Sequence, residues 1–390
     1  MSSRSKTSSK RNGVNGNGHS EDPKAQWSTQ TYSLEDLSEQ FTLPQVVRCT
    51  STLLTTKDKP LPVNLTQPML LFETRTIRKL LARNVMYDPR IRKYNETDET
   101  IVIPSDYEGR FVRLKSRTAK DHTVHRSIES LAACRVPAFL NLTNITAFHL
   151  SKHNKTSNDY PRVEYTPGNI FIIDKVIMGT TKVKPDSKIM RAKSANGLHV
   201  QEMHYLKCRD ERESDVIIPI NHPGEFTEIL PNPFMNGKLS LRSADIITSQ
   251  KFPMVVRYVY GGNKPRLTQF SGLFTLLDSF EERSVVACVL NTSGFTLIEL
   301  PLSSTLSFRL ALNSHDLFPI PLMKSAMRLC EKKAPVFKRD IKFKFKFAQK
   351  IQEATEQLLD RSISGESVDL VPPSARDAAK LGITQTYFYL

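Results

Sequence analysis

The chain is poor in cysteine and in clustered histidine, and this scarcity narrows what can hold the fold together. The cysteines are odd in number and far apart, and none forms a CxxC pair. This spacing argues against a disulfide framework and against a zinc site, so the sequence predicts no bound metal. The five are Cys49, Cys134, Cys208, Cys288 and Cys330.

Long apolar runs are also missing. No stretch approaches the roughly 18 apolar residues that a membrane span needs, and the first residues lack the apolar core of a secretion signal. We therefore expect a cytoplasmic protein without a transmembrane segment.

The signatures of common enzyme classes are absent as well. The sequence contains no GxSxG, GxxxxGK[ST] or HExxH motif and no set of protein-kinase motifs. We expect no catalytic residues, no cofactor and no enzymatic activity.

Positive charge is in excess, with a formal net charge of +15 over 390 residues. Dense positive charge attracts polyanions without specifying which one, although basic residues also simply solvate a surface. The basic residues concentrate in Arg75–Lys93 and Lys324–Lys350. These two stretches are candidates for contact with a polyanion or a phospholipid surface.

A short motif occurs three times. Each copy has an apolar strand, a proline, and a phenylalanine seven residues after the proline; two copies have a glycine two residues before the phenylalanine. In the middle copy, His222–Glu225 is typical of a tight turn in which Pro223 fixes φ and Gly224 supplies a positive φ. We assign the motif residues a structural role. They are Ile103, Pro104, Gly109 and Phe111; Ile218, Pro219, Ile220, Gly224 and Phe226; and Leu300, Pro301 and Phe308, with Leu306 in the glycine's place.

A helix pattern followed by a strand also recurs. Serines at positions 33, 127 and 243 can cap short helices, and a proline follows each after ten or eleven residues. Short strands separated by turns favour barrels or sandwiches. We predict a mostly β fold, a tandem of strand-rich barrel or sandwich units with short capping helices and disordered termini, in which each phenylalanine packs against the helix of its own unit.

The same patterns suggest a domain organisation. A disordered basic tail covers residues 1–30, and an all-β module covers 31–315, with units at about 31–118, 125–232 and 241–312. A basic extension over 316–360 contains a helix and an alternating strand, and a flexible tail covers 361–390.

The basic extension carries the first candidate binding residues. Ser325 and Pro335 begin a fourth copy of the helix-to-strand pattern, which then runs into Ile341–Phe347, where lysine and phenylalanine alternate strictly. This alternation predicts a strand that buries its phenylalanines and leaves a cationic face as a candidate contact with an anionic surface, although lysines on an edge strand also discourage aggregation. The cationic face consists of Lys342, Lys344 and Lys346.

The last residues are a second candidate for partner binding. An exposed end with Phe388 and Leu390 can add as a strand to a carboxylate-binding domain, and Tyr387 is a candidate phosphorylation site. The alternative is that this segment folds back onto an apolar patch of the same chain.

The segment Leu206–Cys208, followed by Val216–Ile220 and Gly224–Phe226, resembles the signature of the CABIT domain, the cysteine-containing all-β module of Themis and of the GAREM adaptors. Cys288 occupies the matching place ahead of the third motif copy. The pairing of Ser33–Val47 with Ile101–Phe111 resembles the GAREM branch more than Themis. The resemblance implies a non-catalytic intracellular adaptor or scaffold in receptor tyrosine kinase to ERK/MAP kinase signalling, with adaptors, tyrosine phosphatases or kinases as partners.

Two other functions stay open. A nucleic-acid-binding β-barrel needs basic residues interleaved with exposed aromatic ones, and the aromatic content of 8% is ordinary, so nucleic acid is the less expected partner. A scaffold at the membrane cortex, in cell polarity, would use Lys324–Lys350 and the segment ending at Leu390.

Overall fold

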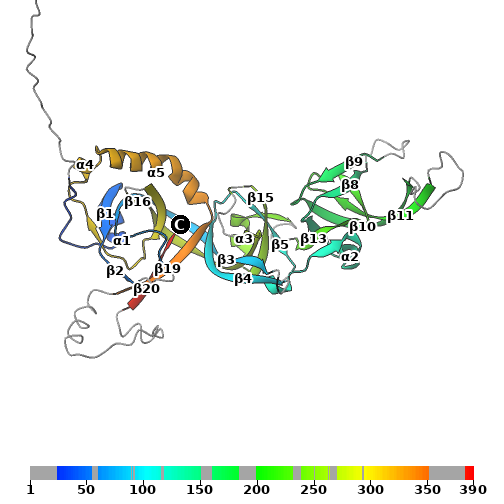
Figure 1. Ribbon diagram of the computed structural model, residues 1–390, viewed down its shortest axis with the longest axis horizontal. Coiled ribbons are helices and arrows are strands. Elements are labelled where there is room, and N and C mark those ends of the chain that lie inside the picture. Colours follow the sequence, from blue (N-terminus) through cyan, green and yellow to red (C-terminus); the bar gives the residue numbers. More distant parts are fainter. Residues whose placement is uncertain are drawn as a thin grey trace, which may run out of the picture.

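Three lobes lie in a row in the computed structural model, each around its own apolar core (Figure 1). The fold is mostly β, as the sequence predicts, with antiparallel strands joined into one network and a few helices. The structure describes residues 24–54, 60–88, 90, 93–115, 118–150, 160–183, 199–231, 239–249, 251–261, 263, 270–291, 294–350 and 383–390.

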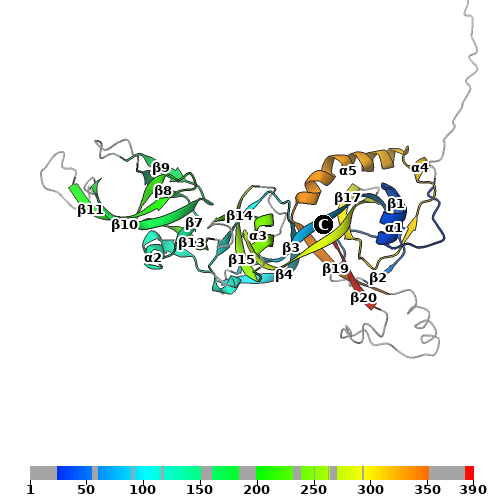
Figure 2. The same ribbon diagram turned by 180° about the vertical axis from the view of Figure 1, so that it is seen from behind.

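The first lobe combines the two ends of the described chain. Its helix α1 begins after Ser33, whose Oγ accepts a hydrogen bond from the Asp36 amide at 3.0 Å, and its apolar face buries Leu34 and Leu37 in the core. A second helix, α5, covers the outside of this lobe (Figure 2). The elements are α1 (Leu34–Gln40), β1 (Gln45–Cys49), β2 (Thr52–Leu54), β17 (Gly294–Pro301), β18 (Phe308–Leu310), α4 (Ser314–Leu317), α5 (Pro321–Arg339), β19 (Lys342–Lys350) and β20 (Ile383–Tyr389).

The middle lobe is also assembled from two distant parts of the sequence. Helix α3 buries Ile246 and Ile247 against Phe111 and Phe274, which come from strands on either side of the core. The elements are β4 (Lys93–Pro104), β5 (Arg110–Leu114), β14 (Ser240–Arg242), α3 (Ser243–Ser249) and β15 (Met254–Tyr260).

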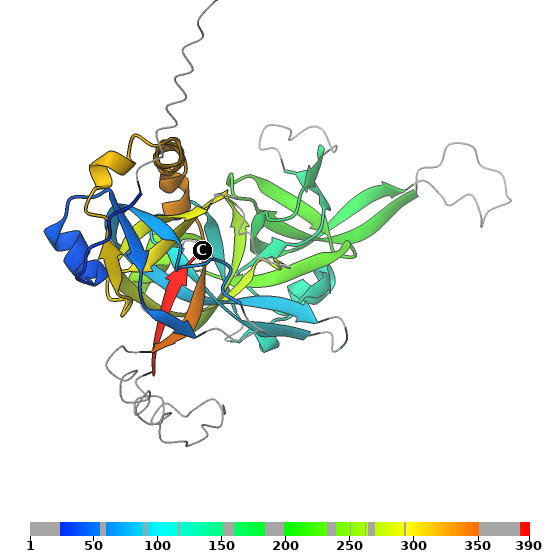
Figure 3. The ribbon, with the colours of Figure 1, turned by 60° about the vertical axis from the view of Figure 1, so that its left-hand side comes forward.

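The third lobe is continuous in sequence. Its core packs Ile128 and Leu131 of helix α2 against Phe139, Phe171 and Phe226. Strands β10 and β11 extend beyond the rest of the lobe as a long hairpin (Figure 3). The elements are β6 (His125–Ser127), α2 (Ile128–Ala133), β7 (Ala138–Asn141), β8 (Ile145–His149), β9 (Arg162–Tyr165), β10 (Ile170–Val183), β11 (His199–Arg209), β12 (Asp215–Pro219) and β13 (Pro223–Leu230), and a 3-10 turn at Ala119–Asp121 precedes them.

Two long strands, β3 (Pro68–Asp88) and β16 (Leu273–Asn291), pass through both the first and the middle lobe. They pair antiparallel from Met69 opposite Val289 to Val85 opposite Leu273. One end of the pair contributes to the first core and the other end to the middle core. The two lobes therefore share a single hydrogen-bonded ladder.

The predicted units 31–118 and 241–312 do not have separate cores, and this corrects the expectation that each phenylalanine packs against the helix of its own unit. The helix of the first unit shares a core with Phe308 of the last unit, whereas Phe111 of the first unit shares a core with α3 of the last. Only the unit 125–232 keeps its own phenylalanine, Phe226, with its own helix, α2, among the described residues. Local sequence patterns therefore identify the helix and the proline motif of each unit. They do not show which helix will share a core with which phenylalanine.

The ends of the described chain are more ordered than predicted. Within the expected tail 1–30, the amide of Ser28 donates to the Leu310 carbonyl at 2.8 Å, and residues 1–23 lie outside the described residues. Within the expected flexible tail 361–390, β20 pairs with β19 over seven residue pairs. Apolar Phe388 explains this difference, because it is fully buried in the first core.

The expected fourth copy is a helix instead. Pro335 lies inside α5, and Met323, Ala326, Cys330 and Ala334 form its buried face. Their spacing of three or four residues places them on one stripe of the helix, which is buried against the first lobe. This packing keeps the chain helical through Pro335, where the sequence pattern predicted a change to a strand. The alternating strand of the basic extension ends at Lys350, and residues 351–360 lie outside the described residues.

A fragment experiment tests this arrangement. Residues 118–231 should fold alone with a cooperative thermal transition, because the third core draws on this segment only. Residues 24–115 should not, because they hold half of each of two cores. Circular dichroism melting of the two purified fragments is the measurement. A cooperative transition in 24–115 alone would contradict the shared architecture.

Candidate functional site

The three proline motifs have the same backbone geometry. Each proline ends a strand, and its carbonyl accepts a hydrogen bond from the amide three residues later: Tyr107 at 3.1 Å, His222 at 3.0 Å and Ser304 at 3.0 Å. The residue after each proline donates to a carbonyl of a neighbouring strand at 2.9 Å. The phenylalanines and the aliphatic residues before the prolines are fully buried, and Ile220 packs against the third core: these are Ile103, Phe111, Ile218, Phe226, Leu300 and Phe308.

The glycines of the motif act through space rather than through backbone conformation. Neither Gly109 nor Gly224 has a positive φ, and the bend lies at Pro219–His222, before the expected position. A Cβ atom at Gly224 would lie 2.8 Å from Cζ of Phe226, and one at Gly109 would collide with the ring of Tyr107. Glycine is therefore needed for the close approach of an aromatic ring, and the predicted positive φ is wrong.

The motif cysteines are buried hydrophobic residues. Cys208 lies in the third core, and burial raises the pKa of its thiol. Cys288 faces α5, where the Cys330 thiol donates a hydrogen bond to its sulfur; this bond lowers the pKa of Cys288 and raises that of Cys330. Both environments keep the protonated thiols away from solvent.

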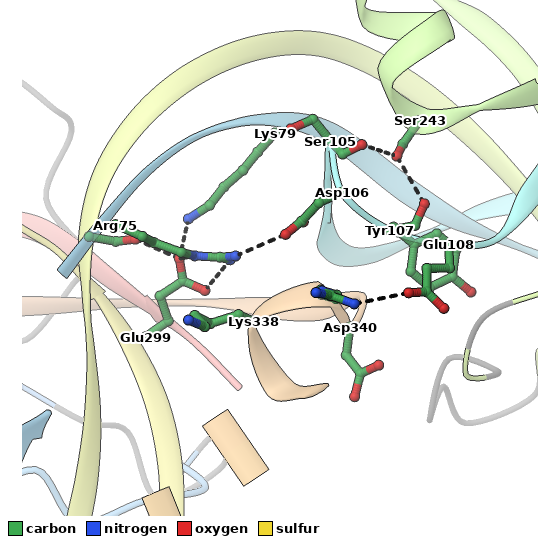
Figure 4. A network of polar contacts seen from close by, with 12 residues as sticks. Arg75, Lys79, Ser105, Asp106, Tyr107, Glu108, Ser243, Glu299, Lys338 and Asp340 are labelled. Carbon is green, nitrogen blue, oxygen red and sulfur yellow. Dashed lines mark hydrogen bonds and ion pairs between the residues drawn. The ribbon is translucent and has the colours of Figure 1, made fainter. Parts of the chain in front are cut away.

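The most charged site lies where β3 and β16 pass from the first lobe to the middle lobe (Figure 4). We name it the crossing cluster: Arg75, Lys79, Glu282, Glu299 and Lys342. Glu299 is its centre and has no exposed surface. Its carboxylate accepts from Arg75 Nη2 at 3.0 Å, from Lys79 Nζ at 2.8 Å and from Ser284 Oγ at 2.6 Å, and Lys342 Nζ lies 3.2 Å away.

The second carboxylate of the crossing cluster is equally well bonded. Lys79 Nζ donates to Oε2 of Glu282 at 2.6 Å, and the hydroxyls of Tyr387 and Tyr389 both donate to Oε1 at 2.9 Å. Every carboxylate oxygen of the crossing cluster thus has a partner. The cluster holds strands together and offers no free acceptor to a ligand.

Charge compensation sets the ionisation of the crossing cluster. Burial alone would raise the pKa of Glu299, but Lys342, Lys79 and Arg75 keep it well below its ordinary value. Burial lowers the pKa of Lys342 to about 8, and only its contact with Glu299 opposes that shift. The carboxylate of Glu299 is therefore what allows three cations to be buried in one place.

The crossing cluster also reaches the proline motif of the middle lobe. Nη1 of Arg75 lies 4.0 Å from a carboxylate oxygen of Asp106, in the turn that follows Pro104. On the other side of this turn, Ser243 Oγ donates to the carbonyl of Ser105 at 3.0 Å (Figure 4). The start of helix α3, the bend and the crossing cluster are thus in one connected chain of contacts.

The predicted cationic face of Ile341–Phe347 is only partly a surface. Lys342 is 2% exposed and belongs to the crossing cluster, which corrects its assignment as a partner-binding residue. The amine of Lys344 lies 3.5 Å from the centroid of the Tyr387 ring, and burial lowers its pKa. Lys346 is the exposed member of the three. Phe347 on the opposite face is buried, and Phe343 and Phe345 are partly buried.

The predicted docking segment at Tyr387–Leu390 is folded into the protein. Phe388 is fully buried, and the backbone of Leu390 exchanges two hydrogen bonds with Phe343, at 2.9 and 3.1 Å. The Tyr387 hydroxyl is bonded to Glu282, and burial raises its pKa to about 12. The alternative prediction, a segment folded back onto an apolar patch of the same chain, is therefore correct. Folding back removes the apolar side chain of Phe388 from water.

Sequence reasoning missed the acidic half of the crossing cluster. Glu299 interrupts an apolar run in β17, and Glu282 lies 17 positions earlier on the neighbouring strand β16. A single acid inside an otherwise apolar strand is the signal that could have found Glu299, because a buried carboxylate requires a cationic partner.

A family model described as "CABIT: Cell-cycle sustaining, positive selection" matches residues 76–319, which is more than half of the chain. The chain belongs to the CABIT family. No curated protein and no solved structure matches it.

The CABIT match covers the middle and third lobes, and it includes all three proline motifs. It also covers most of the strands that build the crossing cluster, although β19 and β20 lie beyond it. None of the described helices combines the length and the apolar character that crossing a membrane requires.

Removing the charge of Glu299 tests the crossing cluster. Glu299→Gln leaves buried cations without their counter-charge and should lower the free energy of unfolding by about 3–5 kcal/mol near neutral pH. Because the folded-state pKa of Glu299 lies below that of an unfolded glutamate, about 4.3, its stabilisation is present above that pH and is lost as the pH falls toward the folded value. The gap between the two proteins in urea denaturation should therefore narrow with acidification.

A matched control is Glu96→Gln. Glu96 pairs with Arg83 at 3.5 Å on the surface and should contribute about 1 kcal/mol or less. Equal losses from the two substitutions, or a gap that does not depend on pH, would contradict the central role of Glu299.

Proposed function

We propose that this CABIT protein is a non-catalytic adaptor that binds signalling proteins in the pathway from receptor tyrosine kinases to ERK/MAP kinase. Family membership supports the proposal, together with the resemblance of the motif region to Themis and GAREM adaptors. The partners are adaptors, tyrosine phosphatases or kinases, met in the cytoplasm or at the membrane cortex.

The observation that carries protein binding is the apolar surface of the β10–β11 hairpin. Val176 is 47% exposed and Met178 is 64% exposed, and both lie on β10 beyond its pairing with β7. Large apolar side chains at such exposure, side by side on a strand, are typical of protein contact sites.

The backbone of this hairpin is available as well. Among the described residues, the backbone of β10 bonds to the β7 side only up to Ile173, and that of β11 bonds to the β12 side only from His204 onward. Beyond these points β10 and β11 pair only with each other in the described part of the chain. An edge of this kind accepts an additional strand, so the hairpin can bind a partner through both side chains and backbone.

Proximity labelling tests the adaptor function. The tagged chain should label tyrosine-kinase pathway proteins more strongly after growth-factor stimulation, and Val176→Asp with Met178→Asp should weaken binding of the recovered partner by at least about tenfold. Both residues are exposed, so the thermal midpoint should not change.

Val336→Asp is the matched control for the adaptor test, because Val336 is 51% exposed on α5 of the first lobe. It should leave the labelling unchanged. Labelling that omits signalling proteins would contradict the adaptor function, whereas equal loss from both variants would contradict the hairpin as the contact.

A scaffold at the membrane cortex is the second candidate, favoured by the outer face of α5. Lys324, Arg328, Lys332 and Lys333 are exposed there, away from the face that packs on the first lobe. A cationic helix face of this kind attracts anionic lipid.

Vesicle sedimentation tests the membrane candidate. Binding to phosphatidylcholine vesicles should require added phosphatidylserine, and Lys324→Gln with Arg328→Gln should weaken it about 30-fold, at about 1 kcal/mol for each charge. Lys346→Gln, at an exposed position of β19, should have little effect. Binding that persists in the double variant would exclude α5 as the contact.

A further inference from the structure

Three side chains that carry different metal-binding atoms meet at one edge of the third lobe. A ring nitrogen of His125, the sulfur of Cys134 and a carboxylate oxygen of Glu228 all lie within 4.8 Å of one another. His125 Nε2 and Glu228 Oε1 are in direct contact at 2.9 Å. We name this group the rim triad.

Secondary structure holds the rim triad in place. His125 begins β6, which pairs with β13 through His125 opposite Phe226, and Glu228 lies two residues further along β13. Cys134 caps the C-terminus of α2, where its amide donates to the Leu131 carbonyl at 3.1 Å. The backbone positions are thus set by hydrogen bonds that do not depend on any ion.

Accessibility differs across the rim triad in a way that suits an ion-binding site. His125 is 8% exposed and Glu228 is half-buried, whereas Cys134 is exposed. The other four cysteines are buried. An ion can therefore reach the triad from the cysteine side and find two further donors behind the sulfur.

The present partners of the rim triad can be exchanged for an ion. Lys115 Nζ lies 2.8 Å from Oε2 of Glu228, but its side chain is 55% exposed and can turn into solvent. The Cys134 thiol donates to the Ser130 carbonyl at 3.3 Å, a weak bond that ends when the thiol loses its proton to a metal.

We propose that His125, Cys134 and Glu228 form a binding site for a borderline transition-metal ion, with Zn²⁺ the best match. Zn²⁺ accepts nitrogen at about 2.0–2.1 Å, thiolate sulfur at about 2.3 Å and carboxylate oxygen at about 2.0–2.2 Å, so tetrahedral donors lie about 3.3–3.6 Å apart. The triad needs adjustments of about 1 Å to reach these separations. Hard ions such as Mg²⁺ and Ca²⁺ prefer oxygen ligands alone, and a thiolate selects against them.

Three protein ligands leave a fourth coordination position for water or for a donor from outside the chain. Sequence reasoning did not find this site and predicts no metal, because Glu228 lies 103 residues from His125. Strand pairing between β6 and β13 is what brings them together.

Cobalt titration of the full chain tests the proposal. After treatment with a chelator under reducing conditions, one equivalent of Co²⁺ should produce d–d bands in the visible and a thiolate-to-cobalt charge-transfer band, and Zn²⁺ should displace it. Cys134→Ser should abolish the charge-transfer band. His125→Ala and Glu228→Gln should weaken binding by more than about 100-fold, since even outer-shell partners of a metal are worth about 10- to 100-fold.

Two controls accompany the cobalt titration. His204→Ala removes an exposed histidine of the same lobe and should leave the spectrum unchanged. Thermal melting without metal checks that each variant folds. If a variant at His125 or Glu228 does not fold, Cys134→Ser decides the matter alone, because Cys134 is exposed. Absence of a charge-transfer band in the unmodified chain, or its persistence in Cys134→Ser, would overturn the metal site.

Discussion

The carboxylate of Glu299 is the group on which the burial of charge between the first and middle lobes depends. Burying it has a large desolvation cost, and its contacts with Arg75, Lys79 and Lys342 offset that cost only because the geometry is nearly complete. These cations come from β3 and β19, whereas the carboxylate comes from β17. The crossing cluster therefore joins strands that no single hydrogen-bonded pair connects.

Two kinds of bonding thus hold the same two lobes together. The ladder between β3 and β16 is continuous through both, and the crossing cluster lies near its middle. A strand pair of this length would otherwise be free to twist or bend between two separate cores. The charged contacts near the middle of the strand pair hold the two cores in a fixed orientation. Through the contact of Arg75 with Asp106, they also hold the proline motif of the middle lobe.

The sequence predicted the local structure well. Proline bends and buried phenylalanines follow from short-range patterns and have equivalent geometry in all three copies. Ser33 and Ser127 cap their helices as predicted, whereas Ser243 is the first residue of α3 and its hydroxyl donates to the Ser105 carbonyl. The sequence could not predict which helix packs with which phenylalanine, because Phe308 and Phe111 offer the same kind of apolar side chain to either helix. Alternation likewise separated the two faces of β19 but did not reveal that Lys342 would meet a carboxylate from another strand.

The same limit applies to both clusters of functional interest. The rim triad and the crossing cluster each combine residues more than one hundred positions apart, so no local sequence spacing predicts them. Gly224 shows a subtler limit. Its identity suggested a special backbone angle, whereas the ring of Phe226 is what excludes a larger side chain.

The route of the chain into and out of the third lobe has an evolutionary consequence. The chain leaves the middle lobe through β5 and returns through β13, and these two strands are hydrogen-bonded neighbours, with Leu114 opposite Ile229. Near this contact, Val85 and Leu273 of the ladder share a core with Leu140 and Ile229 of the third lobe, so the ladder constrains only the inner end of that lobe. Sequence changes in the outer part of the β10–β11 hairpin, which lies beyond this shared core, can therefore alter recognition and leave the ladder of β3 and β16 intact.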